Sequence, residues 1–461
     1  MKGNPIRVGN DGNFSFVASV YRSLMMRIFL MVLLALPLAA AEYFIAPDGD
    51  DAQQGTLAKP FATLMRAQKQ LKPGDTVFVR GGTYVMKDEH ITRKEYNRAI
   101  VCWFDRSGMP DKTIRYAAYQ DEKPVFDFSQ VKPRGYRVHA FSARGSWLRF
   151  EKLTIIGVQV TIVGHTQSIC VENSGSNNVF DQLTMRDGQA IGFWLGRGSN
   201  NLVLNCDAYN NHDFTSDGGR GGNVDGFGFH VPAGCVNNVF RGCRAWFNSD
   251  DGFDSISTSE AQRIENCWAF YNGLSQEFKS LGDGNGFKVG GYASTPVDRL
   301  PKKIPRHVVV KSIAAANKAS GFYANHQMGG ITFWNNSAYR NRCNYNMLGR
   351  ARDHIKDVPG YNHVLKNNVG VSGRRELDNI NREACDVSHN SFDLKNPITE
   401  KDFESVDVKE LMRPRKSNGD LPDIDFMRPK KSSPLIDIGA DVGLPFSGKK
   451  PDLGAIELGG K

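Results

Sequence analysis

The chain has 461 residues, of which 40% are hydrophobic and 23% are charged, so it can bury a large core and is not typical of a disordered protein. Its formal net charge of +9 would suit an anionic partner. The Lys and Arg residues are scattered, with no run of five or more, so we expect no nucleic-acid partner and favour an acidic polymer.

The N-terminus has the pattern of a secretory signal. Arg27 precedes the apolar run Ile28–Leu38, and the small residues Ala39–Ala41 follow as a cleavage site. About eleven apolar residues are too few to span a bilayer, which needs roughly 20. We therefore assign residues 1–41 to an N-terminal extension with a cleavable signal peptide, and expect a secreted or periplasmic protein without a membrane span.

A short helix is predicted near the start of the mature chain, at Pro60–Leu71. Its apolar residues share one face and are Phe61, Leu64, Ala67 and Leu71. The open end of a coiled repeat protein exposes strand edges, so this helix is a candidate cap. The strand Thr76–Val79 would begin the first coil.

One motif occurs five times in the middle of the chain. The copies are Leu202–Asn211, Val239–Asn248, Arg263–Asn272, Val308–Asn317 and Thr332–Asn341. Steps of 37, 24, 45 and 24 residues separate them, so the unit is about 24 residues with inserted loops. Short apolar runs broken by Asn and Gly exclude a helical repeat and predict stacked strands, an all-β parallel β-helix with strands about 4.8 Å apart.

Each copy ends in Asn, five positions after a small residue that is often Cys. We expect the Asn residues to occupy a tight turn, where Asn tolerates left-handed backbone and its amides hydrogen-bond from rung to rung. The eight Cys show no metal or redox spacing, so buried thiols are the simpler interpretation.

A second, independent repeat is a Gly-Phe pair. Its phenylalanines, Phe193, Phe227, Phe253, Phe287 and Phe322, are predicted to stack in the interior. Because side chains alternate along a strand, the residues that follow would form one exterior column. This column contains Trp194, Gly228, Asp254, Lys288 and Tyr323. It is a candidate substrate groove.

Ser433–Glu457 is rich in Gly, Pro and Asp and lacks helical periodicity, so it is predicted to wrap around the coils. No linker is evident before it. Residues 42–461 are therefore assigned to one parallel β-helix domain with a C-terminal wrap.

Four carboxylates are expected to converge on this column. Asp250, Asp251 and Asp254 share a turn, and Asp225 precedes Asp250 by 25 residues, about one coil. Like charges at short range oppose ionisation, and a hard cation with oxygen ligands, such as Ca²⁺, would relieve that repulsion. A solvated acidic turn and a pair of catalytic carboxylates are the alternatives.

Lys288 stands in the same column as Asp254, one repeat later. It is either half of a salt-bridge ladder or a general base whose pKa burial and a cation would lower. A β-elimination on a uronic acid needs both parts of such a site. The ion would neutralise the substrate carboxylate, and neutral Lys288 would take the C5 proton before the C4 oxygen leaves.

The segments Asn223–Phe227, Asn248–Asp254 and Gly284–Gly291 resemble polysaccharide lyase family 9, the calcium-dependent pectate lyases and related rhamnogalacturonan lyases. The resemblance implies a right-handed, single-stranded parallel β-helix. It also implies Ca²⁺ ligands at Asp225, Asp250, Asp251 and Asp254, with Lys288 as the Brønsted base. The substrate would be an acidic plant cell-wall polysaccharide, pectate or rhamnogalacturonan I.

We expect the protein to act as a monomer. Further side chains could bind the substrate. The candidates are Arg220, His230, Tyr323, Arg340 and Arg342. Two other functions stay open. An inverting polygalacturonase-like hydrolase would use paired carboxylates, although its Gly-His-Gly and Arg-Ile-Lys motifs are absent from the coil region. A calcium-stabilised carbohydrate-binding β-helix would bind the metal without needing Lys288.

Overall fold

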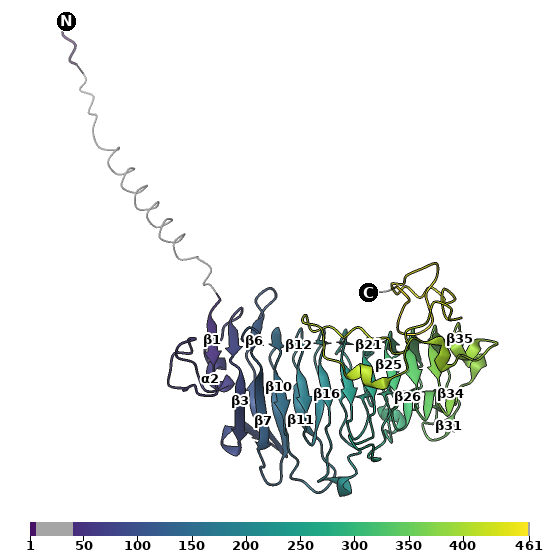
Figure 1. The fold of residues 1–461 in the computed structure, drawn as a ribbon. Helices are drawn as coiled ribbons and strands as arrows, with labels where there is room; N and C mark the ends of the chain where they lie inside the picture. Colours follow the sequence, from purple (N-terminus) through teal and green to yellow (C-terminus); the bar gives the residue numbers. More distant parts are fainter. Residues whose placement is uncertain (6–39, 460–461) are drawn as a thin grey trace. The chain divides into compact units, whose positions relative to one another are not determined.

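The computed structural model describes residues 1–5 and 40–459 (Figure 1). The chain divides into two units, Met1–Ala40 and Ala41–Lys461, and the second contains all of the strands described here. The predicted signal segment falls largely within residues 6–39 and so lies outside the described residues. Among the residues that are described, none belongs to a helix long and apolar enough to cross a membrane.

Three long sheets run along the second unit, with 12, 10 and 11 strands. The first sheet contains β1 (Glu42–Ile45), β2 (Thr76–Val79), β6 (Ile114–Ala118), β9 (Leu148–Glu151), β12 (Val179–Asp181), β15 (Leu202–Leu204), β18 (Val239–Arg241), β21 (Arg263–Glu265), β24 (His307–Val310), β27 (Ile331–Trp334), β32 (Val364–Lys366) and β35 (Asp386–Ser388). The second contains β3 (Gly82–Lys87), β7 (Pro124–Gln130), β10 (Thr154–Ile156), β13 (Thr184–Arg186), β16 (Asp207–Tyr209), β19 (Arg244–Trp246), β22 (Trp268–Phe270), β25 (Ile313–Ala315), β28 (Ser337–Tyr339) and β33 (Val369–Val371). The third contains β4 (Arg93–Glu95), β5 (Arg98–Phe104), β8 (Arg137–Ala143), β11 (Ser168–Asn173), β14 (Ala190–Leu195), β17 (Phe227–Phe229), β20 (Phe253–Asp254), β23 (Phe287–Lys288), β26 (Ser320–Tyr323), β29 (Cys343–Asn346) and β34 (Arg375–Asp378).

From β6 to β34, each turn of the chain adds one strand to each sheet, so neighbours in a sheet come from successive coils and pair in parallel. The exceptions are antiparallel, the β4–β5 pair and the small hairpin of β30 (Gly349–Arg350) and β31 (Asp357–Val358). Seven short 3-10 helices lie in the connections. They are η1 (Asp88–His90), η2 (Asp217–Gly219), η3 (Val297–Arg299), η4 (Arg382–Ala384), η5 (Ser391–Asp393), η6 (Glu400–Asp402) and η7 (Val408–Met412). The predicted parallel β-helix is confirmed.

The N-terminal helix forms but is shorter than predicted. It is α2, Leu64–Gln68, and the Thr63 side chain caps it by accepting from the Arg66 amide. The chain before it stays extended because the Phe61 amide donates to the Phe44 carbonyl, which continues the pairing of β1. The apolar face is buried as expected, with Phe61, Leu64, Ala67 and Leu71 all at most 4% exposed.

The Gly-Phe repeat builds the interior of the third sheet. Phe193, Phe227, Phe253, Phe287 and Phe322 align in register and are fully buried. From Phe227 onward the rings stack with centroids 4.8, 4.8 and 5.0 Å apart. The residue after each Phe faces outward, and the predicted exterior column is confirmed.

The Asn repeat forms a buried hydrogen-bond ladder. The Asn248 amide nitrogen donates to Asn272 Oδ1 at 3.1 Å, and the Asn272 and Asn317 amides continue the ladder to Asn341 at 3.0 Å each. The expectation of left-handed backbone at these residues is wrong. The preceding residue takes that conformation, as at Tyr271 with φ of 57°, because it turns the chain so that the Asn side chain points inward.

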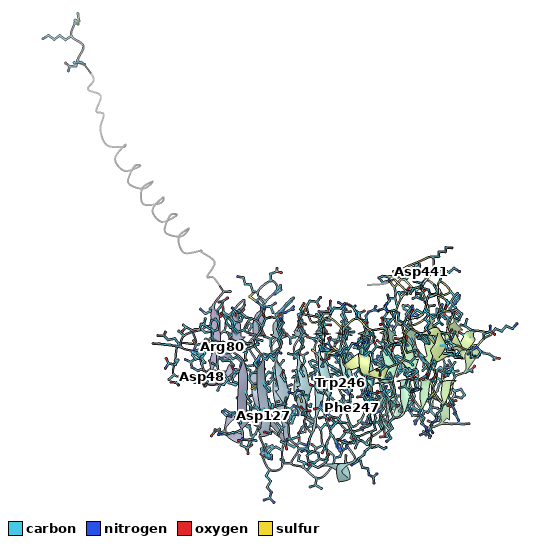
Figure 2. The ribbon with its side chains drawn as sticks, viewed as in Figure 1. Asp48, Arg80, Asp127, Trp246, Phe247 and Asp441 are labelled. Carbon is cyan, nitrogen blue, oxygen red and sulfur yellow. The ribbon has the colours of Figure 1, made fainter. Side chains whose placement is uncertain are left out.

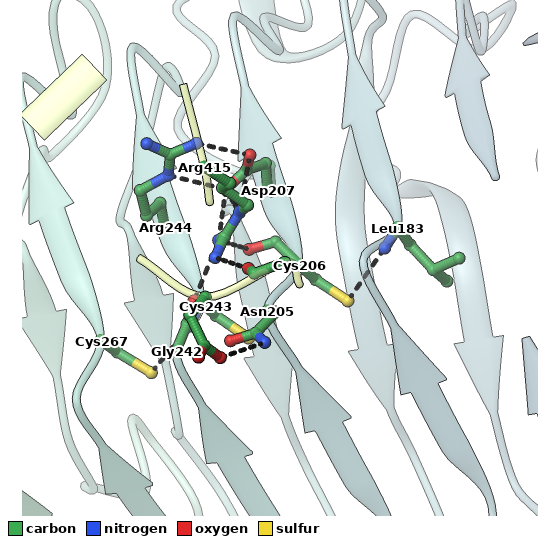
Figure 3. A network of polar contacts seen from close by, with 12 residues as sticks. Leu183, Asn205, Cys206, Asp207, Gly242, Cys243, Arg244, Cys267 and Arg415 are labelled. Atoms are coloured by element: carbon green, nitrogen blue, oxygen red, sulfur yellow. Dashed lines mark hydrogen bonds and ion pairs between the residues drawn. The ribbon is translucent and has the colours of Figure 1, made fainter. Parts of the chain in front are cut away.

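The Cys residues of the repeat pack as buried free thiols, as expected. Cys206, Cys243 and Cys267 lie beside one another on successive coils (Figure 3). Next to them Asp207 forms ion pairs with Arg244 at 2.8 Å and with Arg415 at 2.6 Å. Because Arg415 comes from the C-terminal segment, this buried network ties that segment to the second sheet.

The C-terminal segment covers part of the outer surface of the second sheet. Leu411 in η7 and Phe426 are buried in one cluster with Trp268 and Phe270. Trp246, labelled in Figure 2, stacks on Tyr209 at the margin of this cluster with ring centroids 4.0 Å apart. Ser433–Glu457 has no strand or helix, and its Ala455 amide donates to Ser337 Oγ in β28.

Asn272→Ala should destabilise the protein by about 2–4 kcal/mol, because it leaves the buried Asn248 amide groups and the Ala245 carbonyl with fewer partners. Chemical denaturation followed by circular dichroism measures this change. Asn396→Ala, at an exposed position, should change the free energy of unfolding by less than about 0.5 kcal/mol. Equal effects of the two variants would show that the ladder adds nothing.

Candidate active site

Carboxylates from two successive coils converge on the third sheet. Asp225 and Asp251 precede the Gly of neighbouring Gly-Phe repeats, and Asp254 is the outward residue of β20. One carboxylate oxygen from each of these three residues lies within 4.8 Å of the others. All three residues are buried, with at most 6% of their surface exposed.

Backbone amides fix these carboxylates in place. Asp225 Oδ1 accepts from the Asp251 amide at 3.1 Å, and Asp251 Oδ1 accepts from the backbone and side-chain nitrogens of Asn285 at 2.7 and 2.9 Å. Asn285 is not among the site residues predicted from the sequence. The repeat could have identified it, because Asn285 fills the same position of the next Gly-Phe repeat as Asp225 and Asp251.

Lys288 completes the cluster from the next coil. Its Nζ donates to Asp254 Oδ2 at 3.2 Å and lies 3.0 Å from Asp251 Oδ2. The latter contact is an ion pair without hydrogen-bond alignment, so Asp251 Oδ2 is a buried acceptor with no hydrogen-bond donor among the described residues. The Lys288 side chain is 14% exposed, which leaves its amine accessible from the outer surface.

Asp250 lies beside this cluster but is held differently. Its Oδ1 accepts from the Asp283 amide at 2.8 Å, and the group of three converging oxygens does not include it. Its charge still acts on Asp225 and on Lys288. Of the four predicted metal ligands, three therefore converge directly and the fourth contributes charge from the adjacent position.

Burial and the proximity of like charges both act on the carboxylates of the cluster. Burial raises the pKa values of Asp225, Asp250 and Asp251, and neighbouring carboxylates raise them further. Burial alone would lower the pKa of Lys288, but the carboxylates, Asp251 first, outweigh it and hold that pKa well above its usual range. One ammonium therefore faces four carboxyl groups, and ionisation of all four together is disfavoured.

The residues present fit a hard divalent cation. All the converging donors are oxygens, none of the described ligand atoms in the group is a thiolate or imidazole, and Asp251 Oδ2 lacks a hydrogen-bond donor. Asp225, Asp251 and Asp254 could supply direct ligands, with Asp250 close enough to add charge. This donor set suits Ca²⁺.

The other predicted substrate residues lie in different places. Tyr323 neighbours Lys288 in register, and the two line a surface cavity together with Arg350. Burial raises the pKa of Tyr323 to about 12, so its hydroxyl stays protonated. Arg342 lines an adjoining cavity that also contains Tyr323. These two candidates lie near the cluster.

Arg340 and Arg220 are less well placed as substrate ligands. Arg340 forms an ion pair with Glu400 at 3.0 Å and lies over the Tyr339 ring. Arg220 is exposed at the end of η2. His230 packs face to face on Trp194 with ring centroids 3.9 Å apart, and burial lowers its pKa, so it supports the indole as a neutral ring.

Comparison with known proteins gives two family matches. Residues 43–368 match the family described as Pel9A-like, right handed beta helix region, and residues 381–442 match the family described as rhamnogalacturonan lyase-like, C-terminal. Among curated proteins, the pectate lyase L of Dickeya chrysanthemi is 31% identical over 90% of each chain. The pectate lyase PEL9 of Emericella nidulans is 27% identical over 85% of this chain and 92% of its own.

Two solved structures share the whole architecture. A rhamnogalacturonan lyase superposes with a TM-score of 0.81 at 44% identity, covering 85% of this chain and 97% of its own. The pectate lyase Pel9A superposes with a TM-score of 0.74 at 29% identity, covering 91% of this chain and 96% of its own. These matches confirm the right-handed hand of the β-helix.

The raised pKa of Asp225 determines how pH should affect stability. Without a divalent cation, folded Asp225 keeps its proton at pH values where the unfolded chain has lost it. Stability therefore falls as pH rises above about 4. Asp225→Asn removes this loss, so in chelator the variant should gain stability relative to the unmodified protein as pH rises above about 4.

Added Ca²⁺ should make the unmodified protein more stable than the Asp225→Asn variant. At 100 times its dissociation constant the ion would stabilise the unmodified protein by about 2.7 kcal/mol and the Asp225→Asn variant by much less. Thermal unfolding with chelator or Ca²⁺ at several pH values measures both effects. Asp441→Asn, an exposed control, should behave like the unmodified protein. Equal stabilisation of the Asp225→Asn variant by Ca²⁺ would rule out a cation site at Asp225.

Proposed function

Because the chain belongs to the Pel9A-like right-handed β-helix family and is a polysaccharide lyase, we propose that it cleaves pectic backbones containing galacturonate by β-elimination at Lys288. The observation that carries this proposal is the amine of Lys288, which lies 3.0–3.2 Å from two of the three convergent carboxylates. A base and a candidate cation site are then within reach of one sugar residue.

The proposed reaction begins with removal of the C5 proton by neutral Lys288. The electrons of the C5–H bond form the C4–C5 double bond as the bond from C4 to the glycosidic oxygen breaks. That oxygen takes up a proton from water, and the Lys288 ammonium returns its proton to the solvent, so the products are a new reducing end and a 4,5-unsaturated uronate. A bound Ca²⁺ would neutralise the substrate carboxylate and make the C5 proton more acidic.

The surrounding residues have supporting roles in this proposal. Asp225, Asp251 and Asp254 would hold the cation, Asp250 would add charge, and Asn285 keeps Asp251 in position. The protonated hydroxyl of Tyr323 is available as a donor to the sugar. Arg342 lies on the adjoining surface, where it could pair with a second uronate carboxylate.

Rhamnogalacturonan I is the substrate best supported. The solved rhamnogalacturonan lyase is 44% identical to this chain, against 29% for Pel9A and 31% for the pectate lyase L of Dickeya chrysanthemi. Residues 381–442 also match a C-terminal family described for rhamnogalacturonan lyase-like proteins. We further propose that the segment before Glu42 directs the protein out of the cytoplasm. A cell-wall polymer of this kind would be met there, outside the cell.

Rhamnogalacturonan I should release a product that absorbs in the ultraviolet, and polygalacturonate should be cleaved at least about tenfold more slowly. Chelator should abolish both activities, and added Ca²⁺ should restore them. Absorbance and reducing ends are followed together. Reducing ends without absorbance would indicate a hydrolase, whereas binding of either polymer without cleavage would indicate a carbohydrate-binding protein.

Lys288→Ala should lower kcat by about 10²–10⁴-fold, the usual contribution of a general base, while Ca²⁺ still raises the melting temperature. Lys366→Ala is a matched control, because Lys366 forms an ion pair with Asp386 on the first sheet and should leave kcat unchanged. A near-normal rate for Lys288→Ala would eliminate Lys288 as the base.

A further inference from the structure

A second charged cluster lies on the third sheet, away from Lys288. Arg144 Nη2 is 2.7 Å from Glu172 Oε2, and Arg98 Nη1 is 3.9 Å from Glu172 Oε1. His139 Nδ1 also lies 2.9 Å from Glu172 Oε2. Burial would raise the pKa of Glu172, but the hydrogen bond and charge of His139, the charge of Arg144 and the Ser142 hydroxyl lower it to about 2. Glu172 is therefore ionised and anchors the two arginines.

This cluster retains an excess of positive charge. Arg137 pairs in register with Arg98 on the neighbouring strand, and no side chain among the described residues forms an ion pair with it. Its Nε is buried without a hydrogen-bond acceptor, and so is the Nε of Arg144. Burial, followed by the charge of Arg98, lowers the pKa of Arg137. Glu95 and Arg93 also act on Arg144 but form an ion pair with each other. Three arginines therefore remain against Glu172, and this excess of positive charge would suit an anionic ligand.

The cluster lies on the same exterior column as the acidic site. Glu172 pairs with Trp194, Trp194 with Gly228, and Gly228 with Asp254, so all four occupy the exterior column described above. Three strand spacings separate Glu172 from Asp254, roughly 14 Å along the axis of the helix. An extended polysaccharide lying along this column would reach both places.

Flat aromatic surfaces lie at and beside the cluster. Trp103 occupies the column two strands before Glu172, and the Arg144 guanidinium lies 4.9 Å from its ring centroid. Trp194 lies beside Gly228, where a Cβ would come within 2.8 Å of the indole, and His230 covers one face of its ring. Indole faces are suitable for packing against sugar rings, and guanidinium groups for pairing with carboxylates.

We propose that Arg98, Arg137 and Arg144, arranged around Glu172, form a distal binding site for a uronate carboxylate of the polysaccharide chain. This inference rests on the proposed function, because that function sets the direction in which the substrate lies along the column. It concerns binding away from the bond that is cleaved. The ligand is an acidic polysaccharide, because a neutral glycan would leave the arginine charges unmatched. Occupation of this site favours long chains over short ones.

Binding can be tested without turnover. In a Lys288→Ala background with chelator present, calorimetry measures the affinity for rhamnogalacturonan I and for polygalacturonate. Adding Arg137→Gln, or separately Arg98→Gln, should weaken binding of the better ligand about tenfold, the effect of losing one charge-assisted contact. Arg115→Gln removes the same charge from the first sheet, where Arg115 pairs with Glu151, and should change affinity less than twofold.

Equal losses of affinity in Arg115→Gln and in both cluster variants would mean that the polymer is attracted nonspecifically by positive charge, which would overturn the site. Unchanged affinity in both cluster variants would also overturn it. Thermal unfolding checks that each variant is folded, and two separate arginines guard against one that is not. In the otherwise unmodified enzyme, Arg137→Gln should raise KM for the polymer but not kcat, and should leave cleavage of short oligosaccharides unaffected. If neither polymer is cleaved, the proposed function fails while the binding measurement still decides the distal site.

Discussion

The rung-to-rung pairing of parallel strands is the constraint on which the rest of the molecule depends. Each coil places its strand about 4.8 Å from the previous one, so equivalent residues of successive repeats fall into columns whatever the length of the loops between them. Asp254 and Lys288 are 34 residues apart in sequence yet are direct partners in the third sheet. The Asn and Phe columns hold this register from inside, which lets the outer column carry charges that do not stabilise the fold themselves.

The acidic cluster shows how the β-helix tolerates repulsion between neighbouring carboxylates. Asp225 and Asp251 each accept the backbone amide of the next rung, so the hydrogen bonds that continue the coil also hold buried carboxylates close together. Lys288 offsets part of their charge and is itself held as an ammonium by them. A base must lose that proton, so a cation among the carboxylates would both relieve the repulsion and favour the neutral amine. Metal site and base are therefore electrostatically coupled.

Most of the architecture could be predicted from the sequence because the repeat is visible in the residues themselves. The Asn and Gly-Phe registers predicted the β-helix, the interior rings and the exterior column, and all were confirmed. Local backbone conformation was harder to predict, since the left-handed residue precedes each Asn and varies from Tyr271 to Ala316. The helix Leu64–Gln68 is shorter than its apolar pattern because pairing of Phe61 with β1 keeps the chain before it extended. Asn285 was missed because it carries no charge, although its repeat position matches that of two aspartates.

The exterior column also explains why a substrate-binding site and a catalytic site can occupy different positions along one face of the β-helix. Its members change from Trp103 through Glu172 and Trp194 to Asp254, Lys288 and Tyr323, while the backbone beneath them repeats. A substitution at one rung alters that position of the column and leaves neighbouring rungs in register, because the residue before it on the strand is buried in the interior and is itself aligned with its neighbours. Arginine around Glu172 and aspartate around Lys288 thus give opposite charges to two parts of the same surface. A polyanionic chain would be attracted by the first and would need a cation at the second.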